Sequence, residues 1–128
     1  MNVHNVVSHV VAADLSGKEY QLVKLTATGI DIAASTDRAI GTLMRGNVKV
    51  ESGSAVGKAC DVYLRGGANI AYVKLGAVAG TLSLGAGLIA DAANPGSMVA
   101  SETNAIAIVW QKVTGAQTAG AVVQVLFL

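Results

Sequence analysis

The sequence predicts an all-β protein, a single-domain antiparallel β-barrel or β-sandwich with short loops and an extended N-terminal arm. Glycines recur as turn signals, and in the first half Gly17, Gly29, Gly41 and Gly53 are evenly spaced. Short runs of Val, Ile, Leu, Ala and Thr lie between them, a pattern typical of a sandwich or barrel. Charged residues make up 13% of the chain, against about 25% in an average soluble domain. A small β protein with so few charges is expected to pack much of its surface against other proteins.

The chain is expected to consist of an N-terminal arm or edge strand, residues 1–16, and one β domain, residues 17–128. The arm is apolar and poor in turn residues, and a turn is predicted at residues 14–17. The even glycine spacing ends after the first half, and the segments between the glycines do not match. We therefore interpret the glycines as turn residues and predict no repeat array.

In the first half, strands are predicted over residues 20–25, 39–44, 47–51 and 59–65, with a turn at Arg45 and Gly46 and a short helical turn at 31–37. Residues 59–65 alternate between apolar and polar, as a half-buried strand does. Cys60, Val62 and Leu64 share its apolar face. The loop 66–69 is predicted to connect this strand as a hairpin to the next one, residues 70–75.

In the second half, short strands are predicted over residues 81–84 and 87–90. Pro95 and Gly96 occupy the second and third positions of a turn at 94–97, which favours a type II turn. The strongest strand patterns are 104–113 and 121–128, which are predicted to form the closing hairpin. The last strand is expected to be central in its sheet.

Neither a membrane nor nucleic acid is expected as a partner. The longest uncharged stretches, residues 75–90 and 113–128, are interrupted by glycines and are shorter than the ~18–20 apolar residues of a membrane-spanning helix. The net charge of +1 gives no electrostatic reason to bind nucleic acid. Residues 1–13 contain no Lys or Arg, which argues against a secretory signal and for a protein that stays where it is made.

No catalytic, cofactor-binding or metal site is predicted, and the chain is not expected to be an enzyme. Residues 82–90 match the glycine spacing of a dinucleotide-binding loop, but Pro95 would end the helix that such a loop requires. His4 and His9 are five residues apart, a spacing that converges on a metal ion neither on a strand nor on a helix. Cys60 is the only cysteine and lies on an apolar face, where a small buried hydrophobe is expected.

Several segments share the pattern of one protein family. They are residues 17–25 (GKEYQLVKL), 39–43 (AIGTL), 57–64, and the closing hairpin of 105–109 and 122–128. In these segments the chain resembles the small capsid decoration, or cement, proteins of tailed bacteriophages. Residues 1–16 lie outside the resemblance, and the loop 112–120 departs from the family's usual acidic loop because it contains no acid.

The resemblance implies a barrel-like subunit that binds the outside of an assembled shell and stabilises it by bridging neighbouring capsid subunits. The implied partners are the major capsid protein and further copies of the chain, with a homotrimer favoured. The implied location is the outer capsid surface of the virion, after synthesis in the host cytoplasm. Binding to the assembled shell in preference to its separated pieces would stabilise it by mass action.

The N-terminal segment is the expected contact with another subunit or with the capsid, because an apolar arm can add a strand to a neighbour. Its contact residues would be Val3, His4, Val6, Val7, His9, Val10 and Val11. Two other functions stay open. A phage tail, fibre or shell component would assemble without limit, whereas a decoration protein stops at a small closed oligomer. A ligand-binding β-barrel would need a cavity lined by aromatic or convergent polar groups, and only 4% of the residues are aromatic.

Overall fold

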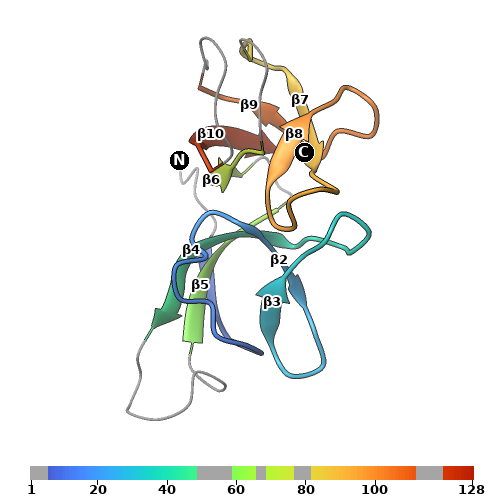
Figure 1. The fold of residues 1–128 in the computed structure, drawn as a ribbon. Helices are drawn as coiled ribbons and strands as arrows, with labels where there is room; N and C mark the ends of the chain where they lie inside the picture. Colours follow the sequence, from blue (N-terminus) through green and yellow to red (C-terminus); the bar gives the residue numbers. More distant parts are fainter. Residues whose placement is uncertain (1–5, 49–58, 66–68, 77–81, 112–119) are drawn as a thin grey trace.

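The computed structural model describes residues 6–48, 59–65, 69–76, 82–111 and 120–128. These residues form ten β-strands and no helix, which confirms the predicted all-β fold (Figure 1). The strands are β1 Val6–Val10, β2 Leu22–Leu25, β3 Ile30–Ile32, β4 Gly41–Val48, β5 Ala59–Leu64, β6 Ile70–Lys74, β7 Gly87–Ala90, β8 Met98–Ala100, β9 Ala107–Val109 and β10 Val122–Phe127.

The strands are divided between two five-stranded antiparallel sheets. The first has the order β1-β5-β4-β2-β3 and the second the order β6-β10-β9-β7-β8. Figure 1 shows the first sheet, in blue to green, beneath the second, in yellow-green to red. The strands form two sheets and not one closed barrel, an arrangement consistent with a β-sandwich.

Several predicted elements are confirmed. At the turn 94–97 the Ser97 N–H donates to the Asn94 carbonyl over 3.0 Å, and Gly96 has a φ of 88°, as a type II turn requires. β9 and β10 form the closing antiparallel pair, and β10 lies between β6 and β9. The last strand is therefore central, as its apolar alternation predicts.

Other predictions are wrong. No turn separates two strands at Arg45, because β4 runs through this position with a register shift against β5 on each side of it. β5 and β6 do not form a hairpin, since they belong to different sheets. Residues 30–32 are a strand instead of the start of a helical turn, and Leu84 lies in a turn instead of a strand. Local pattern misleads at these places because it does not report which strands pair.

The two sheets repeat the same topology. If the strands of each half are counted from one to five, both sheets have the order 1-5-4-2-3. In each sheet a parallel bridge also connects the residue after the first strand to the third strand. This bridge pairs Val11 with Ile30 in the first sheet and Leu75 with Met98 in the second. We call the described parts of residues 6–65 and 70–128 the first and second repeat.

The register is repeated as well. Gly41 pairs with Leu64 in the first repeat, and Ala107 pairs with Phe127 in the second. Backbone hydrogen bonds outside the ladders recur at corresponding positions. In the first repeat these bonds run, from N–H donor to carbonyl, from Ala12 to Ile30, Ala33 to Leu22, Ile40 to Val23, Tyr20 to Leu43 and Arg65 to Ile40. Their counterparts in the second repeat, in the same order, run from Gly76 to Met98, Ser101 to Gly87, Ile106 to Leu88, Gly85 to Val109 and Leu128 to Ile106. The repeat is therefore a duplication of backbone structure.

The same positions fill the interior of both repeats. Fully buried residues inside the first sheet correspond, strand by strand, to buried residues inside the second. These pairs are Val11 and Leu75, Val23 and Leu88, Ile30 and Met98, Leu43 and Val109, Cys60 and Val123, and Val62 and Val125. Each large apolar side chain buried in this way contributes about 1.5–3 kcal/mol. Only one of these pairs is identical, which explains why the sequence predicts no repeat.

The outer face of the first repeat packs against the second repeat. Leu22 and Tyr63 lie on this face and belong to the same apolar cluster as Val73 and Phe127 of the second repeat. Main-chain bonds reinforce the contact, since the Leu22 N–H donates to the Gly96 carbonyl over 2.7 Å. Because side chains on neighbouring β-strand positions face opposite sides, Leu22 joins the shared core while Val23 fills the interior of its own repeat.

Candidate functional site

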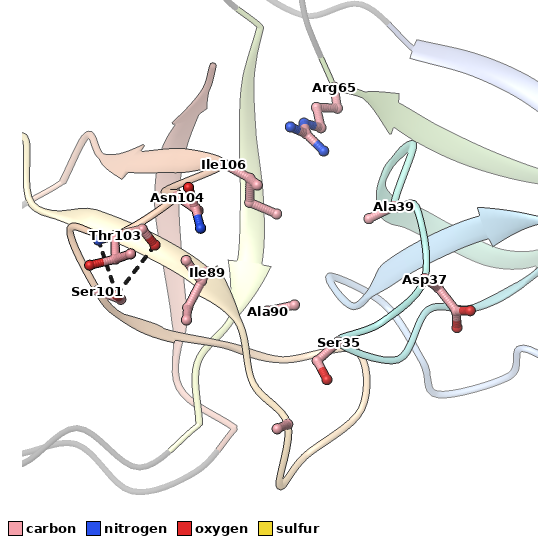
Figure 2. A pocket seen from close by; sticks show the side chains of 11 residues that line it. Ser35, Asp37, Ala39, Arg65, Ile89, Ala90, Ser101, Thr103, Asn104 and Ile106 are labelled. Carbon is pink, nitrogen blue, oxygen red and sulfur yellow. Dashed lines mark hydrogen bonds between the residues drawn. The ribbon is translucent and has the colours of Figure 1, made fainter.

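A cavity lined by both polar and apolar side chains lies between the two repeats. It has a volume of about 470 Å³ and opens to solvent. Figure 2 shows that the loops after β3 and β5 line one side and that β7 and the loop after β8 line the other. The side chains that line it are Ser35, Asp37, Ala39, Arg65, Ile89, Ala90, Ala92, Ser101, Thr103, Asn104 and Ile106. The walls therefore come from strands that are far apart in the sequence.

Two charged side chains, Asp37 and Arg65, line this cavity. Asp37 accepts hydrogen bonds from the Lys24 ammonium over 2.9 Å and from the Ala34 N–H over 2.8 Å. The Lys24 hydrogen bond, followed by that of Ala34, holds the pKa of Asp37 below its usual value. The Arg65 guanidinium points into the open space (Figure 2), and within the described lining it is the one cationic side chain. The cavity can accommodate a small anionic or polar group.

The described lining of this cavity contains no His or Cys. Ser101 is engaged locally, because its hydroxyl accepts the Thr103 N–H over 3.2 Å. Across the described residues, no group of three or more His, Cys, Asp or Glu side chains is placed to hold a metal ion. Arg65 is the cationic side chain of this lining, and sequence reasoning did not single it out.

The predicted contact residues of the N-terminal segment occupy one edge strand. Val3 and His4 lie outside the described residues. Val6, Val7, His9 and Val10 lie on β1, whose five residues are all exposed. β1 pairs with β5 on one side only and is the edge of its sheet. An exposed edge of this kind presents unpaired backbone groups to a neighbouring strand.

Val11 differs from the other predicted contact residues. Its exposed fraction is 0%, and it packs inside the first repeat against Ile30 and Val62. The adjacent Ala12 N–H donates to the Ile30 carbonyl over 2.8 Å. Val11 is therefore a core residue and is not available to a partner, because the bridge at the end of β1 turns its side chain inward.

A second exposed apolar surface lies on the other repeat, and sequence reasoning missed it. Leu84 and Trp110 are 64% and 49% exposed. With Gly85, Ile108 and Val109 they line a shallow apolar hollow of about 210 Å³. Trp110 is the only Trp in the chain, and Trp is enriched among the interface residues that contribute most of the binding energy. That lone Trp at the end of an apolar strand is the signal that points to this surface.

The remaining sequence candidates lie inside the fold or away from one another. Cys60 is buried, and burial, followed by the nearby Asp61 carboxylate, raises the pKa of its thiol to about 11. Such a thiol is a small core side chain and not an activated nucleophile. Residues 82–90 form a turn followed by β7, without the helix that a dinucleotide loop needs. His9 lies on exposed β1, while His4 is outside the described residues.

A scan against protein-family models found no match, and a search of curated proteins found no similar sequence. None of the described residues belongs to a helix that is long and apolar enough to cross a membrane.

Proposed function

We propose that this chain is a structural protein of a phage virion that binds the outer surface of the assembled capsid and bridges neighbouring capsid subunits. The observation that carries this proposal is the presence of two exposed apolar surfaces on a small β protein with few charges. Val10 of β1 is 42% exposed and Trp110 of the second repeat is 49% exposed. Exposed apolar surface of this kind marks contact with other proteins.

The resemblance to decoration proteins in residues 17–128 supplies the class of partner, the major capsid protein. In this role the protein works as a homo-oligomer, with a trimer favoured, and acts by clamping. Each copy bound across a junction of the shell adds binding free energy to the assembled state only, and this opposes dissociation of the capsid. No covalent step and no cofactor enter this mechanism.

The test is cosedimentation with the capsid of the phage that carries the gene. Purified protein is mixed with assembled empty shells and, separately, with dissociated major capsid protein. We expect the protein to pellet with the shells, to saturate at a fixed ratio to capsid subunits, and to raise the temperature at which the shells dissociate. Equal retention by both forms of the capsid protein, or retention by neither, contradicts the proposal.

A self-assembling tail, fibre or shell component is the second candidate, since the two apolar surfaces lie on different repeats. This candidate predicts growth of the purified protein into long assemblies in the absence of any capsid. Light scattering at increasing concentration separates the two functions, because a decoration protein stops at a small closed oligomer.

A further inference from the structure

The contact between the two repeats has two sides. The first repeat contributes an outer face, which we call its docking face, with Tyr20, Leu22 and Tyr63. The second repeat contributes the edge strand β6. The Lys74 N–H of β6 donates to the Tyr20 carbonyl over 2.7 Å. The ring of Tyr72 lies 6.0 Å from that of Tyr20 and 6.3 Å from that of Tyr63. One repeat therefore docks through its outer face on the first strand of the other.

The second repeat has a docking face of its own, because its backbone matches that of the first. Gly85 occupies the position of Tyr20, and both have a left-handed backbone with φ of 82° and 67°. Leu126 occupies the position of Tyr63, and Trp110 follows β9 as Met44 follows Leu43 in β4. Met44 packs against the core shared by the two repeats, whereas Trp110 is 49% exposed. This second docking face has no partner among the described residues.

The first repeat likewise has its own receiving strand. β1 is the counterpart of β6, and its outward residues Val6 and Val10 correspond to Ile70 and Lys74. Ile70 is 9% exposed, while its counterpart Val6 is 38% exposed. The outward face of the receiving strand is thus more buried on β6 of the second repeat than on β1 of the first.

The exposed large hydrophobic residues are concentrated on these two surfaces. Three of them belong to β1, where Val6 and Val10 lie on the outward face and Val7 lies on the opposite face. Leu84 and Trp110 line the hollow beside Gly85. Val122 shares the outward face of Leu126, whereas Leu128 lies beside Leu64 and Arg65 of the first repeat. Among the described residues, the exposed large hydrophobic residues outside both surfaces are Val7, Leu25 and Leu128. Exposed apolar side chains therefore occur on both surfaces that correspond to the two sides of the contact between the repeats.

We propose that the docking face of the second repeat, around Leu84 and Trp110, binds β1 of a second copy of this chain, in the manner in which the first repeat already docks on β6. The equivalent main-chain bond would run from the Val10 N–H of one copy to the Gly85 carbonyl of the next. Such a contact joins different surfaces, so it produces a closed ring where the rotation closes and an open chain where it does not. The inference rests on the homo-oligomer of the proposed function and deepens it, since it names the two surfaces through which the copies meet.

The test uses two variants, each of which removes one surface. Trp110→Glu places a charge on the docking face, and Val10→Glu places one on the receiving strand. Leu25→Glu is the matched control, because Leu25 is 54% exposed and lies on neither surface. Masses are measured by light scattering from about 1 μM to about 1 mM, a range in which moderate affinities are resolved. Circular dichroism and thermal unfolding establish that each variant remains folded.

We expect the unaltered protein and Leu25→Glu to form the same oligomer and each of the other two variants to be monomeric. Mixing Trp110→Glu with Val10→Glu then restores a single contact, between the intact docking face of one and the intact β1 of the other. The mixture should therefore stop at a one-to-one dimer. A dimer formed by Val10→Glu alone would overturn the proposal, because it would show that the docking face binds its own copy. A monomeric unaltered protein at the highest concentration would overturn it as well.

The outcome is independent of the capsid experiment. Failure of shell binding with an intact oligomer contradicts the proposed function alone. A monomeric unaltered protein that still binds shells contradicts this inference and the homo-oligomer, leaves capsid binding intact, and assigns the exposed surfaces to the capsid protein.

Discussion

The first and second repeats have the same strand order and register, yet their outer faces have different surroundings. In the first repeat Leu22 is fully buried and Tyr63 is 8% exposed, because the second repeat covers them. At the matching positions the second repeat has Gly87 and the half-buried Leu126. Backbone pairing therefore determines the fold of each repeat, while the side chains on one face determine what each repeat binds.

The largest expected effect is at Gly41, whose counterpart in the second repeat is Ala107. A Cβ at residue 41 would overlap the Tyr63 carbonyl oxygen across the strand pair. Because this obstacle is backbone and cannot rotate away, Gly41→Ala should lower the free energy of unfolding by about 4 kcal/mol. Denaturant unfolding measures the change. The reverse change at the counterpart, Ala107→Gly, should lower the free energy of unfolding by only about 1 kcal/mol. Equal costs would contradict the expected difference between the two positions.

Next in size is the contact between the repeats. Leu22→Ala removes a fully buried side chain from the shared core and should cost about 3 kcal/mol. Leu25→Ala, on the same strand but 54% exposed, should change the free energy of unfolding by less than about 0.5 kcal/mol. Urea unfolding of both variants tests the assignment. A similar cost for the two would mean that the repeats do not share a core.

A smaller effect is expected at the matching left-handed positions. Gly85 has a φ of 82°, and a Cβ added there would meet open space, so Gly85→Ala introduces only backbone strain. It should destabilise the protein by about 1 kcal/mol, measured as a lower midpoint of thermal unfolding. Tyr20 tolerates the same conformation in the first repeat, because its ring contact with Tyr72 and its bond from Lys74 offset the strain. An unchanged midpoint would show that this turn relaxes in solution.

The smallest effect at neutral pH is expected at Cys60, whose counterpart is Val123. The folded thiol has a pKa of about 11, above its ordinary value of 9.0. Its contribution to stability is therefore complete below pH 9 and is lost as the pH rises toward 11, because the unfolded chain releases the proton first. Cys60→Val should change the free energy of unfolding by less than about 1 kcal/mol at about pH 7. It should also reduce the loss of stability at alkaline pH. Burial also raises the pKa of Tyr63, so part of that loss should remain.

The same thiol gives a chemical test of burial. At about pH 9 a maleimide or iodoacetamide probe should label Cys60 in the folded protein at least about tenfold more slowly than in the unfolded chain, because only the thiolate reacts. Unfolding in urea should restore the ordinary rate. Equal rates in both states would place Cys60 at the surface and remove it from the interior positions that the repeats share.

Local features of this protein follow from the amino-acid sequence alone. The alternation around Cys60 and Val62, the Pro95–Gly96 turn and the final strand result from side-chain period and backbone preference, which act over a few residues. Local pattern also predicts an N-terminal arm or edge strand, and Val6–Val10 form the exposed edge strand β1. It could not place Val11 in the core, because that depends on a bridge to Ile30, distant in the chain.

The construction from two matching sheets, by contrast, becomes visible only in the tertiary structure. Strand order and register depend on pairings between distant residues, and apolar side chains of different identity fill equivalent interiors equally well. For this reason Ile30 and Met98, or Cys60 and Val123, hold the same place without any resemblance in sequence. The same long-range pairing covers Met44 and leaves its counterpart Trp110 exposed, a difference that no local pattern could reveal because it depends on which face the other repeat covers.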